Sequence, residues 1–301
     1  MVRTMTHADF SDVLRGGRFR CDGEAITIEV KKLGDLIVRS GRVTVCDPLA
    51  PSVVLDLART VPKGKHPVEV AVAKIGKDQR VALGCVRFGK GKPVRWEMAT
   101  ARGQNAKKLG PDEFFGYGVD AGTGCFVDTK AMKRLESEET GEAIFEALEK
   151  TRVYTWAWAN VALGDANVVA FSSGFGDGFY GSYWGLGAKD EVIALVTDFG
   201  LMTEPIEEKL VFPLAGPFKH PKLKEAGVTF TAVKGKRLAY RLRGEGHVSL
   251  ATAKGKLVPS DADRSYTDRD QTVRFKPKKP PADLHVAVTI TLGFKPATRV
   301  K

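Results

Sequence analysis

The chain has 301 residues, of which 43% are hydrophobic and 28% charged, a composition typical of an ordinary globular protein with one or two domains. No apolar run approaches the length of a transmembrane helix, and the N-terminal residues lack the apolar segment of a signal peptide. We therefore expect a cytoplasmic protein with no membrane partner. The four cysteines form no C-x-x-C pair and lie at no ligand spacing from a histidine, so buried core thiols are a better interpretation than a zinc site.

The net charge of +11 is distributed unevenly along the chain. After residue 214 there are 19 basic and 7 acidic residues, a net charge of +12, whereas the first 214 residues contain 28 basic and 29 acidic ones. The composition also changes around 213–221. This asymmetry predicts two domains, 1–214 and 215–301, of which the second is basic.

The first domain is expected to consist mostly of β-strands. Alternating or β-branched segments bounded by glycine or proline predict strands at 25–31, 36–40, 42–46, 67–73, 79–88, 93–100 and 154–161. One long amphipathic pattern, at 131–148, predicts a helix in which Gly141 allows a break. Its expected buried positions are Met132, Leu135, Ile144, Phe145 and Leu148.

The most distinctive stretch is 167–199, where glycine-dense turns separate three predicted strands at 168–172, 179–184 and 192–197. Four glycines and four aromatic residues surround Asp177 between positions 174 and 183. Aspartate between glycines is typical of a tight turn, because its side chain bonds nearby backbone amides. A hairpin at 176–178 is therefore the simplest interpretation of this motif.

The basic domain shows no helical periodicity. Short strands are predicted at 228–233, 237–242, 247–251, 271–275 and 284–292, with polar loops at 260–270 and 276–281. Such a pattern indicates a small sandwich or barrel. The expected fold class of the whole chain is thus β-rich α+β, with mostly antiparallel sheets and one long helix, followed by an all-β C-terminal sandwich or barrel.

Several short motifs follow one another in an order that carries a family resemblance. They are Asp47-Pro48, Trp96-Glu97, the sequences VDAG at 119–122 and CFVD at 125–128, Ser173-Gly174, the sequence GDGFY at 176–180, and Asp198-Phe199. Over roughly residues 30–200 the chain resembles the bacterial domain-of-unknown-function family numbered 4241. That family has no established activity, so the resemblance implies a β-rich domain and no mechanism. The basic C-terminal segment lies outside it.

Carboxylates and aromatic residues on these turns are the candidate binding residues. They are Asp120, Asp128, Asp177, Asp198, Glu97, Tyr180, Tyr183 and Trp184. Three interpretations remain open: structural turns, a ligand or partner site, and a divalent cation site. The last would make the protein a metal-assisted hydrolase that uses the four aspartates, because carboxylates on flexible glycine turns can surround a hard cation. There is no P-loop, Rossmann fingerprint or nucleophile elbow, and no other cofactor is predicted.

Basic residues of the C-terminal domain form the second candidate surface. They are Lys234, Lys236, Arg237, Arg241, Arg243, Lys254 and Lys256. Such a surface attracts an acidic protein or a nucleic acid, or it is simply solvated. The leading hypothesis is a non-catalytic binding protein, of an immunity or effector-neutralising type, with an acidic protein partner. The alternatives are the metal-assisted hydrolase and nucleic-acid binding through the C-terminal domain.

Overall fold

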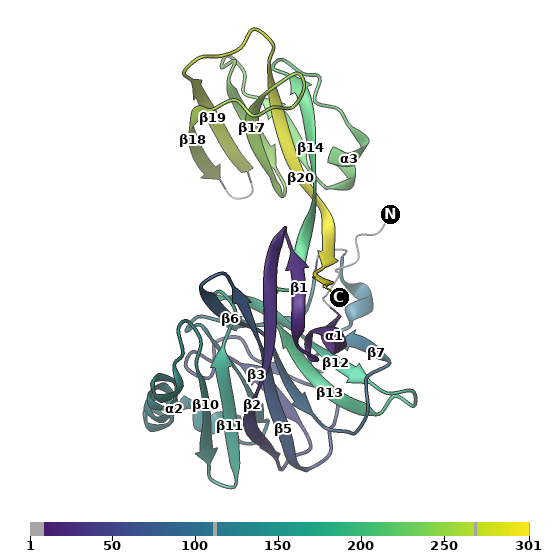
Figure 1. Ribbon diagram of the computed structural model, residues 1–301, viewed down its shortest axis with the longest axis vertical. Helices are drawn as coiled ribbons and strands as arrows, with labels where there is room; N and C mark the ends of the chain where they lie inside the picture. Colours follow the sequence, from purple (N-terminus) through teal and green to yellow (C-terminus); the bar gives the residue numbers. More distant parts are fainter. Residues whose placement is uncertain (1–8, 111–112, 268–269, 301) are drawn as a thin grey trace. The chain divides into compact units, whose positions relative to one another are not determined.

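The chain folds into two units, each built on antiparallel β-sheets (Figure 1). The computed structural model describes residues 9–110, 113–267 and 270–300. Among these, the smaller unit is Pro205–Phe294, and the larger unit contains 9–204 and 295–300. These limits differ from the expected boundary after residue 214. The chain passes from the larger to the smaller unit within β14 (Thr203–Pro213). It returns to the larger unit before β21 (Thr298–Arg299), which pairs with a strand of that unit.

The larger unit contains two sheets. The first has the order β21-β1-β2-β5-β6-β13-β12-β7, with β8 beside β12, and the second has the order β10-β11-β9-β3-β4. The strands of the first sheet are β1 (Gly17–Cys21), β2 (Glu24–Val38), β5 (Gly64–Ile75), β6 (Asp78–Arg87), β7 (Arg95–Met98), β8 (Gly116–Val119), β12 (Gly178–Leu186) and β13 (Val192–Asp198). Those of the second are β3 (Val43–Cys46), β4 (Leu55–Asp56), β9 (Thr123–Asp128), β10 (Trp158–Leu163) and β11 (Ala166–Ser172).

The inner strands of the second sheet, β3, β9 and β11, are buried on both faces. Phe126 and Phe171 pack with the first sheet in one hydrophobic core. Their neighbours Val127 and Ala170 point the other way and form a separate core with the helical segment. Because successive side chains of a strand alternate between faces, one short strand supplies both cores.

The long helix was predicted correctly in its position, but its break was not. A 3-10 helix, η2 (Met132–Glu136), ends at Ser137, whose hydroxyl accepts a hydrogen bond from the amide of Thr140 and so caps α2 (Glu138–Thr151). Gly141 lies inside α2, and Phe145 is 57% exposed instead of buried. Two further short helices, α1 (Phe10–Val13) and η1 (Ala106–Lys108), complete the larger unit.

The central stretch forms its three predicted strands, yet they do not belong to one sheet. β11 lies in the second sheet, whereas β12 and β13 pair with each other in the first. Residues 173–177 therefore cross from one sheet to the other. The hairpin expected at 176–178 is wrong, because a hairpin would require β11 and β12 to pair.

The smaller unit is a sandwich, one of the two forms that the sequence predicted. Its sheets have the orders β14-β20-β17 and β15-β16-β19-β18, and apolar side chains from both form one core. The elements are α3 (Pro221–Glu225), β15 (Thr229–Ala232), β16 (Ala239–Arg243), β17 (Gly246–Thr252), β18 (Ser260–Thr267), β19 (Asp270–Pro277) and β20 (Leu284–Pro296). β18 replaces most of the loop expected at 260–270, of which 268–269 lie outside the described residues.

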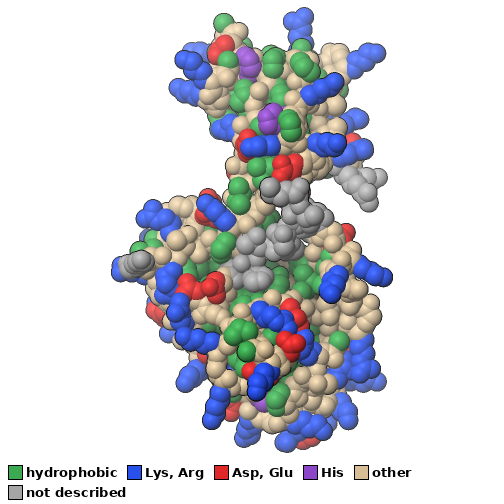
Figure 2. Space-filling view, turned by 90° about the vertical axis from the view of Figure 1, so that its right-hand side faces the viewer, with side chains coloured by type: hydrophobic (Ala, Val, Ile, Leu, Met, Phe, Trp, Pro, Cys, Tyr) green, Lys and Arg blue, Asp and Glu red, His purple; other side chains and the backbone are tan. Residues whose placement is uncertain are grey.

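Lysine and arginine side chains project from the surface of both units (Figure 2). Within the described part of the chain, no helix is both long enough and apolar enough to cross a membrane. The β-rich fold class with mostly antiparallel sheets is confirmed.

Candidate functional site

Two glycine turns lie side by side at one end of the larger unit's sandwich. The amide of Gly122 donates to Asp177 Oδ1 at 3.1 Å, and the amide of Ser173 donates to the Gly122 carbonyl oxygen at 3.0 Å. Topology explains the meeting. β8 pairs with β12 in the first sheet and β9 pairs with β11 in the second, so the connections β8–β9 and β11–β12 cross between the sheets at the same place. We call residues 120–122 and 173–177 the glycine rim.

Asp47, which follows β3, fixes the first turn of the rim. Its side chain is fully buried, and Oδ2 accepts hydrogen bonds from the amides of Asp120 at 3.0 Å and Ala121 at 2.7 Å. Oδ1 accepts another from the amide of Leu49 at 2.9 Å. A buried carboxylate is tolerated when amides solvate it in this way. Asp47 therefore holds the backbone of the rim and is not itself accessible.

Two aromatic side chains stand out from the rim into solvent. Phe175 is 69% exposed and Phe179 is 47% exposed, and the guanidinium of Arg80 lies 5.4 Å from the centre of the Phe175 ring. The candidate residue Tyr180 is half-buried and donates from its hydroxyl to the Gly176 carbonyl oxygen at 2.8 Å. Burial, assisted by the charge of Asp177, raises the pKa of Tyr180, so the phenol is held neutral as a hydrogen-bond donor.

A cavity of about 200 Å³ opens beside the rim. It is lined by backbone of both turns and by side chains that include Arg80, Arg152, Thr155 and Ser172. Each arginine already has a carboxylate partner: Arg80 Nε lies 2.8 Å from Asp78 Oδ2, and Arg152 pairs with Glu149. The cavity is thus polar without a strong excess of either charge, a character that suits a peptide group or a neutral polar side chain.

The remaining aromatic candidates lie in the core. Tyr183 is 6% exposed and packs against Phe10 of α1, with ring centres 5.0 Å apart, and Trp184 is 2% exposed. Neither can contact a binding partner, because both faces of β12 are covered at these two positions. Phe175 and Phe179, which were not chosen from the sequence, are the accessible aromatics instead. Their places beside Gly174, Gly176 and Gly178 were the available signal, since glycine-rich turns lie at surfaces.

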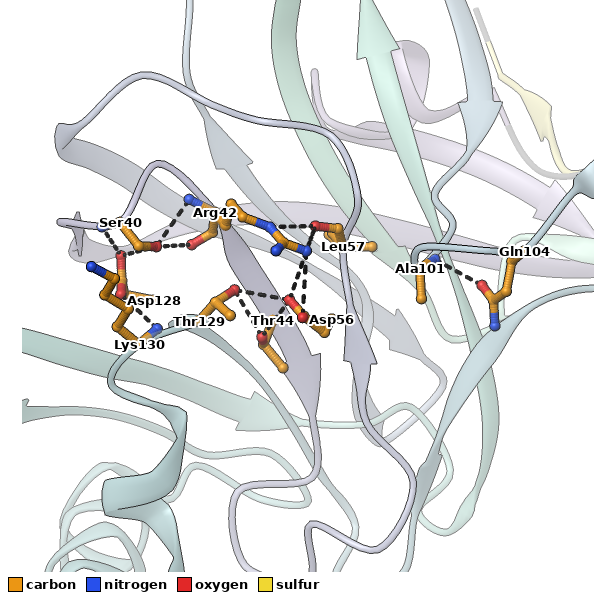
Figure 3. A network of polar contacts seen from close by, with 10 residues as sticks. All are labelled: Ser40, Arg42, Thr44, Asp56, Leu57, Ala101, Gln104, Asp128, Thr129 and Lys130. Carbon is orange, nitrogen blue, oxygen red and sulfur yellow. Dashed lines mark hydrogen bonds and ion pairs between the residues drawn. The ribbon is translucent and has the colours of Figure 1, made fainter.

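Of the candidate aspartates, only Asp120 and Asp177 belong to the rim. Asp128 lies at the other end of β9, where its buried carboxylate accepts from the amide of Arg39 at 2.7 Å. It also accepts from the amide of Ser40 at 2.7 Å and from the Ser40 hydroxyl at 2.8 Å (Figure 3). Asp198 accepts from the amide of Gly200 at 2.9 Å in a local turn.

Glu97 lies on β7 and forms ion pairs with Arg59 and, at 2.7 Å, with Arg95. Asp128, Asp198 and Glu97 are therefore engaged at separate places, away from Asp120 and Asp177 in the rim. Among the described residues, no group of three or more His, Cys, Asp or Glu side chains is arranged to hold a metal ion. The ligand set on which the metal-assisted hydrolase depended is not assembled.

The basic candidates of the smaller unit fall into two groups. Arg241 and Arg243 lie on β16 and face the carboxylate of Asp270, with Arg243 Nε 2.7 Å from Asp270 Oδ1. The hydrogen bond from Arg243 lowers the pKa of Asp270. The other five residues are exposed in turns, and within the described part of the chain they form no ion pair. They are Lys234, Lys236, Arg237, Lys254 and Lys256.

Comparison with known proteins agrees with the resemblance seen in the sequence. A family model described as protein of unknown function (DUF4241) matches residues 36–197, a range that includes Asp47 and the whole glycine rim. No curated protein and no solved structure matches the chain. Because the matched residues make up more than half of the 301, the chain belongs to the DUF4241 family of proteins of unknown function.

Proposed function

We propose that this protein is a non-catalytic binding protein that recognises a protein partner through the glycine rim. The observation that carries the proposal is the pair of exposed phenylalanines, Phe175 and Phe179, on and beside a backbone that other residues hold in place. Aromatic side chains dominate the energetics of protein interfaces, and a fixed backbone lowers the entropy lost on binding. A rim of this kind is therefore suited to recognition.

The hydrogen bonds of the rim support binding over catalysis. The carboxylates of Asp47 and Asp177 accept from backbone amides, and the Tyr180 hydroxyl donates to a carbonyl oxygen. A general base needs a lone pair directed at substrate, and a general acid needs a proton directed at it. These three polar groups instead form hydrogen bonds that hold the two turns in place.

The charge of the smaller unit supports an acidic partner. The five basic candidates that form no ion pair within the described residues would draw an acidic protein towards the chain and raise the association rate, while aromatic contacts at the rim would slow dissociation. The effector-neutralising role expected from the sequence is one case of this function. Such a protein acts by occupying a partner's surface and needs no turnover.

The experiment compares rim variants in partner capture. The full chain is immobilised, a lysate of the native host is applied, and each captured protein is purified and its affinity measured. We expect Phe175→Ser and Phe179→Ser each to weaken binding about tenfold or more, as loss of an interfacial aromatic anchor does. Val94→Ser is the matched control, because Val94 is 66% exposed, about as much as Phe175, but lies away from the rim. The amide of Val94 donates to the carbonyl oxygen of Leu186, at the opposite end of β12. Equal affinities for the wild type and both phenylalanine variants would reject the rim as the binding surface.

A further inference from the structure

Five cationic side chains lie on two turns of the smaller unit, and one of these turns is at the end where β20 begins, since Thr252 of β17 pairs with Leu284 of β20. Lys234, Lys236 and Arg237 occupy the β15–β16 turn, and Lys254 and Lys256 occupy the turn that follows β17. The last residues of β14 and those that follow it link these turns. Gly255 faces the Val211 side chain, and Leu214 and Ala215 lie against the β15–β16 turn. We call this set of five residues the cationic end. Figure 2 shows lysine and arginine side chains along the upper edge of the unit.

The cationic end has less internal counter-charge than the neighbouring β16 surface. Asp270 neutralises part of the charge of Arg241 and Arg243, and Asp263 and Asp261 pair with Lys276 and Lys278. Within the described residues no carboxylate pairs with the five residues of the cationic end. Asp283, which accepts from the amide of Ala253 at 3.3 Å, offsets only part of their mutual repulsion, so an external anion is still attracted.

An apolar hollow of about 450 Å³ lies among these charges. Its apolar lining comes from Leu214, Ala215, Ala232 and Val233, and its charged edge from Lys234, Lys236 and Arg237. The lining contains no aromatic ring. A single-stranded nucleic acid binds chiefly by stacking its bases on aromatic side chains, which the hollow does not offer. Its aliphatic walls favour an apolar side chain instead.

We propose that the cationic end binds an acidic peptide segment of the partner, with one large aliphatic side chain inserted into the hollow and carboxylates facing the lysines. This proposal rests on the proposed binding function and names the chemistry of the segment recognised by the smaller unit. Electrostatic attraction brings the segment to the surface, and burial of the aliphatic side chain selects it among other anions.

Fluorescence anisotropy with the full chain tests the proposal. The probe is a short fluorescein-labelled peptide of glutamate and serine with one central leucine, and the matched probe has serine in place of the leucine. We expect the leucine peptide to bind about tenfold more tightly, because one leucine side chain is removed from water. Ala232→Trp fills the hollow and should abolish this preference. The double variant Lys234→Glu/Lys236→Glu should weaken both peptides about tenfold or more.

Arg241→Glu/Arg243→Glu is the matched control, since it makes the same change in charge outside the cationic end and should leave the preference for leucine intact. Equal binding of the two peptides, or none, would overturn the proposal. Tighter binding of a single-stranded oligonucleotide of equal charge would assign the surface to nucleic acid. Phe175→Ser should bind the leucine peptide like the wild type, so a failure of the rim and a failure of the cationic end are told apart.

Discussion

The carboxylate of Asp47 and the amide of Ala121 are 2.7 Å apart although 74 residues separate them in the chain. This contact joins the end of β3 to the connection between β8 and β9. On its other side, the same connection is bonded to Asp177 through the amide of Gly122. Three chain segments therefore meet at the rim. Two carboxylates fix its backbone, that of Asp47, which is buried, and that of Asp177, which is exposed to solvent.

Asp47→Ala should destabilise the larger unit strongly. The substitution leaves the amides of Asp120, Ala121 and Leu49 without their buried acceptor, and hydrogen bonds to a charged group are among the stronger ones. We expect the free energy of unfolding, measured by urea denaturation, to fall by about 3 kcal/mol or more.

Asp120→Ala is the matched control for this prediction, because Asp120 belongs to the same turn but is exposed and accepts from the Ser52 hydroxyl at 3.2 Å. It should lower the stability by less than about 1 kcal/mol. Equal losses in the two variants would mean that Asp47 does not hold the turn.

A pair of tyrosine variants separates the hydrogen bond of the rim from that of the core. Tyr180→Phe removes the bond to the Gly176 carbonyl oxygen, which water can replace, and should cost about 1 kcal/mol. Tyr117→Phe removes a buried bond of 2.8 Å to the hydroxyl of Thr197. Since Thr197 is fully buried, its hydroxyl is left unpaired and the cost should be larger, about 2 kcal/mol. The reverse order of the two losses, measured by thermal or urea unfolding, would contradict this account.

Many of the strands were predictable from the sequence, because they alternate or are rich in β-branched residues between glycine and proline. The glycine-rich strands β8 and β9 were not predicted, and neither was the assignment of strands to sheets. The pattern of 167–199 shows three strands, but nothing local indicates that β11 and β12 lie in different sheets. The meeting of the two glycine turns follows from this crossing. Spacing along the chain therefore could not show that Asp177 lies in the rim whereas Asp128 lies at the opposite end of β9.

Exposure was the other property that the sequence did not provide. Tyr183 and Trp184 are adjacent and point to opposite faces of β12, so one of them would be exposed in a sheet covered on one side only. Phe10 of α1 covers Tyr183, and Trp184 packs beside Phe88 with ring centres 6.3 Å apart, so both are buried. β18 shows the opposite case, because nearly all of its side chains are exposed. An edge strand of this kind has no apolar alternation and resembles a loop.

The packing of the two sheets can be tested at Gly84. A Cβ atom at this position would overlap the ring of Phe171 and lie 3.1 Å from Thr197 Cγ2, so Gly84→Ala should cost about 2 kcal/mol by overpacking. Phe171→Leu makes room for the added methyl group. The double variant should therefore lose less stability than the sum of the losses of the two single variants, by about 1 kcal/mol or more. Ile144→Val, in the other core, should combine additively with Gly84→Ala. Full additivity with Phe171→Leu would mean that the two side chains do not face each other.

The final prediction concerns Cys85, a fully buried thiol on β6 whose burial raises its pKa from 9.0 to about 12. Between these values the unfolded chain has released the proton and the folded chain retains it. The unfolded state therefore binds fewer protons, and stability present below pH 9 is lost as the pH rises towards 12. The slope of stability against pH that one such group contributes is about 1.4 kcal/mol per pH unit.

Urea denaturation at several pH values above 9 should give a slope of stability against pH that is shallower for Cys85→Ala by that amount. Val86→Ala, a neighbouring core truncation without a titrating group, should lower the stability but keep the slope of the wild type. If Cys85→Ala and the wild type lost stability in parallel, the thiol would have to ionise as readily in the folded protein as in the unfolded chain, and its place in the core would be refuted.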